Sequence, residues 1–204
     1  MTSTRASTKS DAILEWARRR GLGYARFDFR GHGESDGDLR SVTMTDLIAD
    51  TAAVVRRVGP SVLIGSSMGG LAATWCTALH PSDVIALVLL SPALGYLPEM
   101  AQQAESFELR PSDQSAITID EQVLRDAEQY DEDALPDRIA VPVLVVHGSQ
   151  DQTVPARRSD AFCRAVPHRD KEFWLIDGGS HSLGEDVVAI IARIETFLAE
   201  RGLV

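Results

Sequence analysis

The chain has 204 residues, of which 44% are hydrophobic, and this length suits one domain with its own core. Its 30 acidic side chains outnumber 20 basic ones, and with a formal net charge of −10 we expect no nucleic-acid partner. We expect neither a membrane span nor a signal peptide. Cys76 and Cys163 lack disulfide or metal spacing. They indicate buried thiols in a reducing compartment, so we expect a cytoplasmic protein.

The first quarter of the chain predicts a helix, a strand and a second helix. Ser10 can cap a helix whose apolar side includes Ile13 and Trp16 and which ends at Gly21. Residues Tyr24–Phe29 read as a strand. Thr43, with Asp46 three residues later, resembles the capping box of the next helix.

The rest of the chain continues this alternation of strands and helices. Strands are predicted at Val62–Ile64, Val84–Leu90, Val141–His147 and Lys171–Ile176, and helices up to His80, at Pro155–Ala165 and at Glu185–Arg201. Continuous apolar runs such as Val84–Leu90 are typical of strands buried on both faces. The pattern predicts one α/β domain over residues 1–204, with a mostly parallel sheet flanked by helices in three layers.

Gly65-Ser66-Ser67-Met68-Gly69 lies where a strand turns sharply into a helix. Only Ser67 has glycine both two residues before and two residues after it, where we expect chains to pass too closely for a Cβ. Such a turn exposes the serine hydroxyl and points the N–H of Met68 at a developing oxyanion. The alternative is a turn rich in glycine and serine without chemistry.

Asp151 and His181 each follow a predicted strand, as Ser67 does. The carboxyl ends of parallel strands share one edge of the sheet, so these three side chains can meet there. Imidazole can take the proton of a serine hydroxyl, and a carboxylate can orient the imidazole. We therefore predict a catalytic triad of Ser67, His181 and Asp151, which needs no cofactor. We predict a hydrogen-bonded, packed role for His147.

No cluster has the spacing of a metal site. Asp131, Glu132 and Asp133 resemble metal ligands only superficially, and we expect them on a solvated face.

An acidic segment with weak periodicity interrupts the alternation at about 92–139. We interpret it as a small lid inserted after the Val84–Leu90 strand, the alternative being a long crossover connection. Its apolar side chains are expected to line the mouth above Ser67 and bind the substrate. They are Leu94, Tyr96, Leu97, Met100 and Phe107.

These motifs resemble those of the α/β-hydrolase superfamily. Gly65–Gly69 looks like its nucleophile elbow, the segment around Asp151 its acid loop, and Gly179-Ser180-His181 its histidine loop. Phe27–Ser35 resembles the segment after its fourth strand. Within the superfamily, Thr8–Ile13 most resembles the short-lidded esterases near the mitochondrial acyl-protein thioesterase and acyl-glucuronide esterase.

The resemblance also implies strands before the first helix, for which this sequence has no counterpart. In the family the third of them lies between the strands matched here by Tyr24–Phe29 and Val62–Ile64, and its loop supplies a second oxyanion N–H. We therefore expect an N-terminally shortened fold, an incomplete version of a longer protein, although the sheet could instead close around the gap. Exposed strand edges would allow pairing between chains, giving an oligomer.

The sequence thus predicts a serine hydrolase that cleaves a small-molecule carboxylic ester or thioester through an acyl-enzyme. Peptidase and carbon–carbon bond hydrolase activities on the same fold stay open as alternatives. So does a non-catalytic, truncated protein of that fold.

Overall fold

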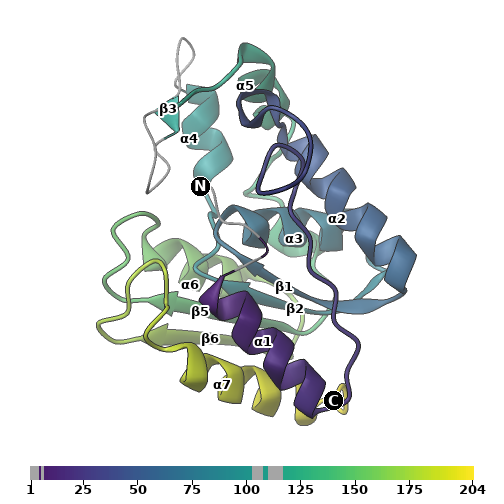
Figure 1. The fold of residues 1–204 in the computed structure, drawn as a ribbon. Coiled ribbons are helices and arrows are strands. Elements are labelled where there is room, and N and C mark those ends of the chain that lie inside the picture. The colour runs from purple at the N-terminus through teal and green to yellow at the C-terminus, as the bar shows by residue number, and fades with distance from the viewer. Residues whose placement is uncertain (1–4, 6, 103–107, 110–116) are drawn as a thin grey trace.

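The computed structural model describes residues 5, 7–102, 108–109 and 117–204 and has a parallel sheet between two layers of helices (Figure 1). The strands lie in the order β1 (Ser61–Ser66), β2 (Val84–Leu90), β5 (Val143–Gly148) and β6 (Lys171–Ile176). One face is covered by α1 (Thr8–Arg19) and α7 (Val187–Ala199), and the other by α2 (Met44–Val58), α3 (Met68–Leu79) and α6 (Ala156–Ala165). The predicted three-layer α/β fold is confirmed.

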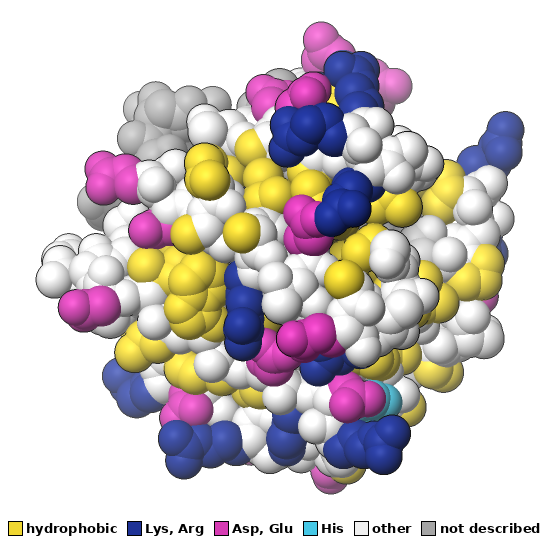
Figure 2. Space-filling model, turned by 90° about the horizontal axis from the view of Figure 1, so that it is seen from below, with side chains coloured by type: hydrophobic (Ala, Val, Ile, Leu, Met, Phe, Trp, Pro, Cys, Tyr) yellow, Lys and Arg dark blue, Asp and Glu magenta, His cyan; other side chains and the backbone are white. Residues whose placement is uncertain are grey.

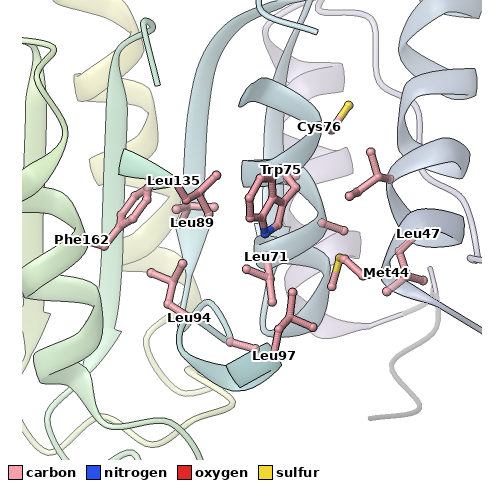
Figure 3. Packing of buried hydrophobic residues seen from close by; sticks show 14 of the residues in the cluster. Met44, Leu47, Leu71, Trp75, Cys76, Leu89, Leu94, Leu97, Leu135 and Phe162 are labelled. Atoms are coloured by element: carbon pink, nitrogen blue, oxygen red, sulfur yellow. The ribbon is translucent and has the colours of Figure 1, made fainter. Parts of the chain in front are cut away.

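The sequence of β2 is apolar because the strand lies between two cores, one on each face of the sheet. Leu87 and Leu89 pack into the core beneath α2, α3 and α6, while Val88 and Leu90 pack beneath α1 and α7. Successive side chains of a strand point to opposite faces, so a strand buried on both sides has no polar positions. Figure 3 shows Leu71 and Trp75 of α3 beside Leu89 in the first of these cores.

Charged side chains join α1, α7 and β6 at the surface. Glu195 of α7 accepts a hydrogen bond from Trp16 Nε1 at 3.0 Å and pairs with Arg20, and Glu172 of β6 pairs with Arg193 at 2.5 Å. Seen from below, acidic, basic and apolar side chains are interspersed over this side of the molecule (Figure 2). Exposed pairs of this kind contribute only about 0–1 kcal/mol each, so the buried core dominates stability.

The predicted strand at Tyr24–Phe29 is wrong, because these residues form no strand pairing. Within the described part of the chain, β1 pairs with β2 on one side and with no strand on the other. A strand exists only where a neighbour satisfies its backbone groups, and Tyr24–Phe29 lacks that neighbour. The N-terminally shortened sheet that the sequence predicts therefore agrees with the observed strand order.

The caps of the first two long helices differ in how well the sequence predicts them. Helix α1 begins earlier than predicted, because the Ser7 hydroxyl, not that of Ser10, caps it and accepts from the Ser10 N–H at 3.2 Å. The capping box of α2 is confirmed, since Thr43 and Asp46 each accept a hydrogen bond from the other's backbone N–H at 3.0 Å.

In its described parts, the segment at 92–139 lies above the sheet in the view of Figure 1. It contains α4 (Tyr96–Gln102), β3 (Glu108–Leu109), β4 (Ile117–Thr118), α5 (Glu121–Ala127) and the 3-10 turn η2 (Pro136–Arg138). A second 3-10 turn, η1 (Leu39–Ser41), precedes α2. Among the described residues, no helix has the length and apolar character to cross a membrane.

Two carboxylates fix this segment, one by joining two of its own parts and one by binding the start of α2. Glu132 accepts the N–H groups of Gly95 and Leu97 at 2.6 and 3.0 Å, at the start of α4, so its predicted place on a solvated face is wrong. Asp126 of α5 is buried and accepts the backbone N–H and the hydroxyl of Thr45, at the start of α2, at 3.0 and 2.5 Å. Each carboxylate therefore satisfies N–H groups in the first turn of a helix.

The turn between β1 and α3 leaves no room for a side chain at Gly65. A Cβ there would lie 2.5 Å from the carbonyl oxygen of Gly69 and 2.7 Å from the Cα of Gly70. The expected crowding at Gly69 is wrong, since the nearest atom to its Cβ would be 3.8 Å away; the second tight position is Gly70, against Pro92 at 3.0 Å.

We predict that Gly65→Ala destabilises the protein by about 3 kcal/mol, because backbone atoms must move to admit the methyl group. Denaturant unfolding followed by circular dichroism measures this change. Gly23→Ala is the matched control, because a Cβ at Gly23 meets nothing within 4 Å and should change stability by less than about 0.5 kcal/mol. Equal stability of the two variants would contradict the prediction.

Candidate active site

Ser67 occupies the strained apex of the turn between β1 and α3. Its φ of 52° and ψ of −124° are rare for a residue with a side chain, and such strain persists only where the surroundings hold it. The Ser67 N–H donates to the carbonyl oxygen of Leu90 at 3.0 Å, and the Ser67 carbonyl oxygen accepts from Ala93 N–H at 3.0 Å. The chain following β2 thus fixes the serine from both sides.

The structure brings the three residues of the predicted triad together. His181 Nε2 lies 3.0 Å from Ser67 Oγ, and His181 Nδ1 lies 2.7 Å from Asp151 Oδ2. The Asp151 side chain is fully buried, whereas 26% of the His181 side chain is exposed. The histidine can therefore exchange protons at the opening of the site while the carboxylate is excluded from solvent.

The Asp151 carboxylate is fully occupied by hydrogen bonds. Its Oδ1 accepts the N–H groups of Thr153 and Val154 at 2.8 and 2.9 Å. Burial opposes ionisation, but the hydrogen bonds from Val154, His181 and Thr153 outweigh it and keep the pKa of Asp151 below its usual value. Asp151 is therefore an anion when His181 faces it at neutral pH.

The loops that carry Asp151 and His181 are packed directly on each other. A Cβ at Gly148 would lie 2.2 Å from the carbonyl oxygen of Gly179, and Gln150 N–H donates to that same oxygen at 2.9 Å. The Ser149 hydroxyl also accepts from Gly178 N–H at 2.8 Å. This backbone contact sets the separation of the two side chains.

An apolar cavity of about 50 Å³ is lined in part by Met68, the residue after Ser67. Of the predicted substrate-binding residues, Tyr96 and Leu97 line it. Leu94 is instead buried in the core, near Leu135 and Phe162 in Figure 3, and is not part of the cavity wall. Met100 lies on α4 but its side chain, like the whole of Phe107, falls outside the described residues.

Most of the cavity wall is not evident from the sequence. The additional residues come from the loop before α2, from α2 itself, from the link between β4 and α5, and from α5, and they are His32, Leu39, Val42, Met44, Leu47, Ile119, Val123 and Ala127. Their apolar positions on amphipathic helices are equally consistent with a filled core, so no sequence pattern distinguishes a cavity wall from a core here.

Two further charged or titratable side chains lie next to the predicted triad. Lys9 Nζ, from the first turn of α1, donates to Ser66 Oγ at 2.8 Å. Burial lowers the pKa of Lys9 to about 8, although the negative charge of Asp151 opposes this shift. His147 is fully buried, and its Nε2 lies 2.9 Å from Asp151 Oδ2. The hydrogen-bonded, packed role predicted for His147 is confirmed.

In the part of the chain that the structure describes, no group of three His, Cys, Asp or Glu side chains could hold a metal ion.

A model of the family described as "Serine aminopeptidase, S33" matches residues 4–120 and 115–187 of this chain. The bovine mitochondrial palmitoyl-protein thioesterase ABHD10 is 28% identical over 94% of this chain and 68% of its own length. The rat monoglyceride lipase is 22% identical over 94% of this chain and 78% of its own length.

Solved structures agree with these sequence matches. Est1E from Butyrivibrio proteoclasticus, with ferulic acid bound, superposes with a TM-score of 0.86 and 26% identity over 98% of this chain and 85% of its own. The mouse α/β-hydrolase domain-containing protein 10 has the same fold, with a TM-score of 0.82 and 24% identity over 98% of this chain and 87% of its own. The chain belongs to the serine aminopeptidase S33 family and is a serine hydrolase of the α/β-hydrolase superfamily, near the ABHD10 group.

Proposed function

We propose that this chain cleaves carboxylic esters or thioesters through an acyl-enzyme formed on Ser67. The single observation that carries the proposal is the hydrogen-bonded line from Asp151 through His181 to Ser67, at 2.7 and 3.0 Å. These distances lie within the reach that a general base needs to a nucleophile and that an orienting carboxylate needs to the base.

The proposed reaction has two halves. Ser67 Oγ attacks the acyl carbon while His181 Nε2 takes its proton, and the tetrahedral intermediate collapses when the leaving alcohol or thiol departs with that proton. Water, deprotonated by His181, then attacks the acyl-enzyme and releases the acid and free Ser67. The N–H of Met68, at the start of α3, supplies an oxyanion hydrogen bond in both halves.

The cavity beside Met68 supports an apolar acyl group as the substrate part that is bound. Its described walls come mainly from Leu, Val, Ile, Met and Ala side chains, and no Asp or Glu is among these described residues. The relatives named as a palmitoyl-protein thioesterase and a monoglyceride lipase act, by those names, on acyl substrates, which supports the same class for this chain.

The assignment of the nucleophile predicts that Ser67→Ala abolishes ester and thioester hydrolysis and covalent labelling by a fluorophosphonate probe. Asp151→Asn should retain more activity than Ser67→Ala, because the base and nucleophile remain. Hydrolysis of p-nitrophenyl esters and mass spectrometry of the labelled peptide give the two readouts. The exposed Ser82→Ala serves as the control serine. If Ser67→Ala still hydrolysed the ester and was still labelled by the fluorophosphonate, the assignment would be overturned.

The cavity assignment predicts that Ala127→Phe discriminates against long acyl chains. Filling space for about two methylene groups removes roughly 1.6 kcal/mol of binding, or about 15-fold in kcat/KM, for octanoyl relative to acetyl esters. Ala189→Phe makes the same change on the exposed side of α7 and should leave the ratio unaltered. An equal loss for acetyl and octanoyl esters in Ala127→Phe would show that the acyl chain binds elsewhere.

Lys9 gives a prediction about pH. Its pKa is about 8 in the folded protein and near 10.5 when free, so between these values the unfolded chain holds more protons and stability rises with pH. Lys9→Met removes the buried ammonium, so this variant should be more stable than wild type at pH 7, with the difference shrinking towards pH 10. Denaturant unfolding of both proteins at each pH measures it. A difference that stays constant with pH would show that the ammonium is not destabilised by burial.

A further inference from the structure

His147 is a fully buried titratable residue for which the proposed mechanism has no role. It lies near the end of β5, and its ring bridges the loop that carries Asp151 and helix α6. Nε2 lies 2.9 Å from Asp151 Oδ2 and 3.0 Å from the carbonyl oxygen of Val154, while Nδ1 lies 2.8 Å from Ser159 Oγ. Every polar atom of the ring thus has a partner.

These partners fix the tautomer of His147. A carbonyl oxygen and an ionised carboxylate carry no proton, so Nε2 must be protonated to donate to Val154 and Asp151. The Ser159 hydroxyl can donate to Nδ1, which leaves the ring neutral with all its hydrogen-bonding capacity used. A neutral ring agrees with its complete burial, because an imidazolium there would need a second counter-charge.

Asp151 Oδ2 therefore accepts from two histidines. His181 Nδ1 approaches it at 2.7 Å and His147 Nε2 at 2.9 Å, while the backbone N–H groups of Thr153 and Val154 occupy Oδ1. The backbone bonds hold one oxygen, and among the described residues the two rings are what hold the other. Without His147, Oδ2 would be held solely by the ring that it is meant to orient.

We propose that His147 is a positioning residue of the reaction: its Nε2–H holds Asp151 Oδ2 against His181 and takes up part of the carboxylate charge that His181 would otherwise face alone. This inference rests on the proposed function, in which His181 is the general base. The other charged group that acts on Asp151 is the Lys9 ammonium of α1. A 1 Å displacement of a catalytic group can lower a rate about 100-fold, so a small movement of Oδ2 is enough to matter.

The test compares two substitutions of His147. In His147→Met the side chain fills the space but donates nothing, so kcat should fall by about 10- to 100-fold with KM nearly unchanged. The acid limb of the pH profile of kcat/KM should also move to higher pH. The charge of the Asp151 carboxylate is then no longer shared with His147, so it favours protonated His181 more strongly. In His147→Gln the amide can donate from the position of Nε2, so both the rate and the acid limb should return towards wild type.

The measurements are kcat, KM and the pH profile with one p-nitrophenyl ester, with circular dichroism and thermal unfolding as checks on folding. A purely structural role for His147 would lower the amount of folded enzyme without moving the acid limb. Equal losses in the Met and Gln variants, or an acid limb that stays in place, would overturn the proposal.

A second variant decides the question if His147→Met does not fold. Ser159→Ala removes the hydroxyl that holds Nδ1 and so loosens the ring whose Nε2–H holds Asp151 Oδ2. It should therefore move the acid limb in the same direction by a smaller amount, and an unmoved limb would overturn the proposal. Failure of the proposed function is recognised separately. In that case wild-type protein would not be labelled by the fluorophosphonate at Ser67, whereas failure of the positioning role leaves wild-type labelling intact.

Discussion

The hydrogen bonds that hold the backbone of Ser67 are the constraint on which the rest of this structure depends. A serine at φ 52° is under strain. It stays there because its N–H donates to Leu90, the last residue of β2, and its carbonyl oxygen accepts from Ala93, three residues later. That arrangement requires β1 and β2 to be in register to their ends, which the pairing of Ser66 with Leu90 provides. The buried neighbours of β2 then determine where the serine hydroxyl lies, so core packing and the site cannot be separated.

The sequence predicts those features that depend on local chemistry and on strand order. Apolar runs locate β1, β2 and β5, and the rule that parallel strands end at one edge brings Ser67, Asp151 and His181 to one place, within hydrogen-bond distance. The prediction fails where the outcome depends on a partner distant in sequence. Tyr24–Phe29 has the composition of a strand but lies where no strand is beside it. The missing neighbour of Tyr24–Phe29 cannot be read from those residues themselves. The cap of α1 is a local error of a different kind, since Ser7 lies only three residues before Ser10.

Acidic side chains illustrate the same limit. Thr43 and Asp46 form a capping box whose two members are three residues apart, so the sequence reveals it. Asp126 and Glu132 satisfy N–H groups in the first turns of α2 and α4, but each does so across the fold, and an acidic segment viewed alone suggests only solvation. Burial raises the pKa of Glu132, which shows how far its surroundings differ from the solvated face that the sequence predicts.

The polar groups around the site have the opposite effect on stability from the core. Lys9 is charged in a partly buried place where its described hydrogen-bond acceptor is a neutral hydroxyl, and it lies in the first turn of α1, where the helix dipole disfavours a cation. His147 and Asp151 are fully buried and tolerable only because each has its hydrogen bonds complete. A fold optimised for stability alone would replace such groups with apolar side chains of similar size. Their concentration within reach of Asp151 is therefore an independent physical indication that this edge of the sheet is built for chemistry.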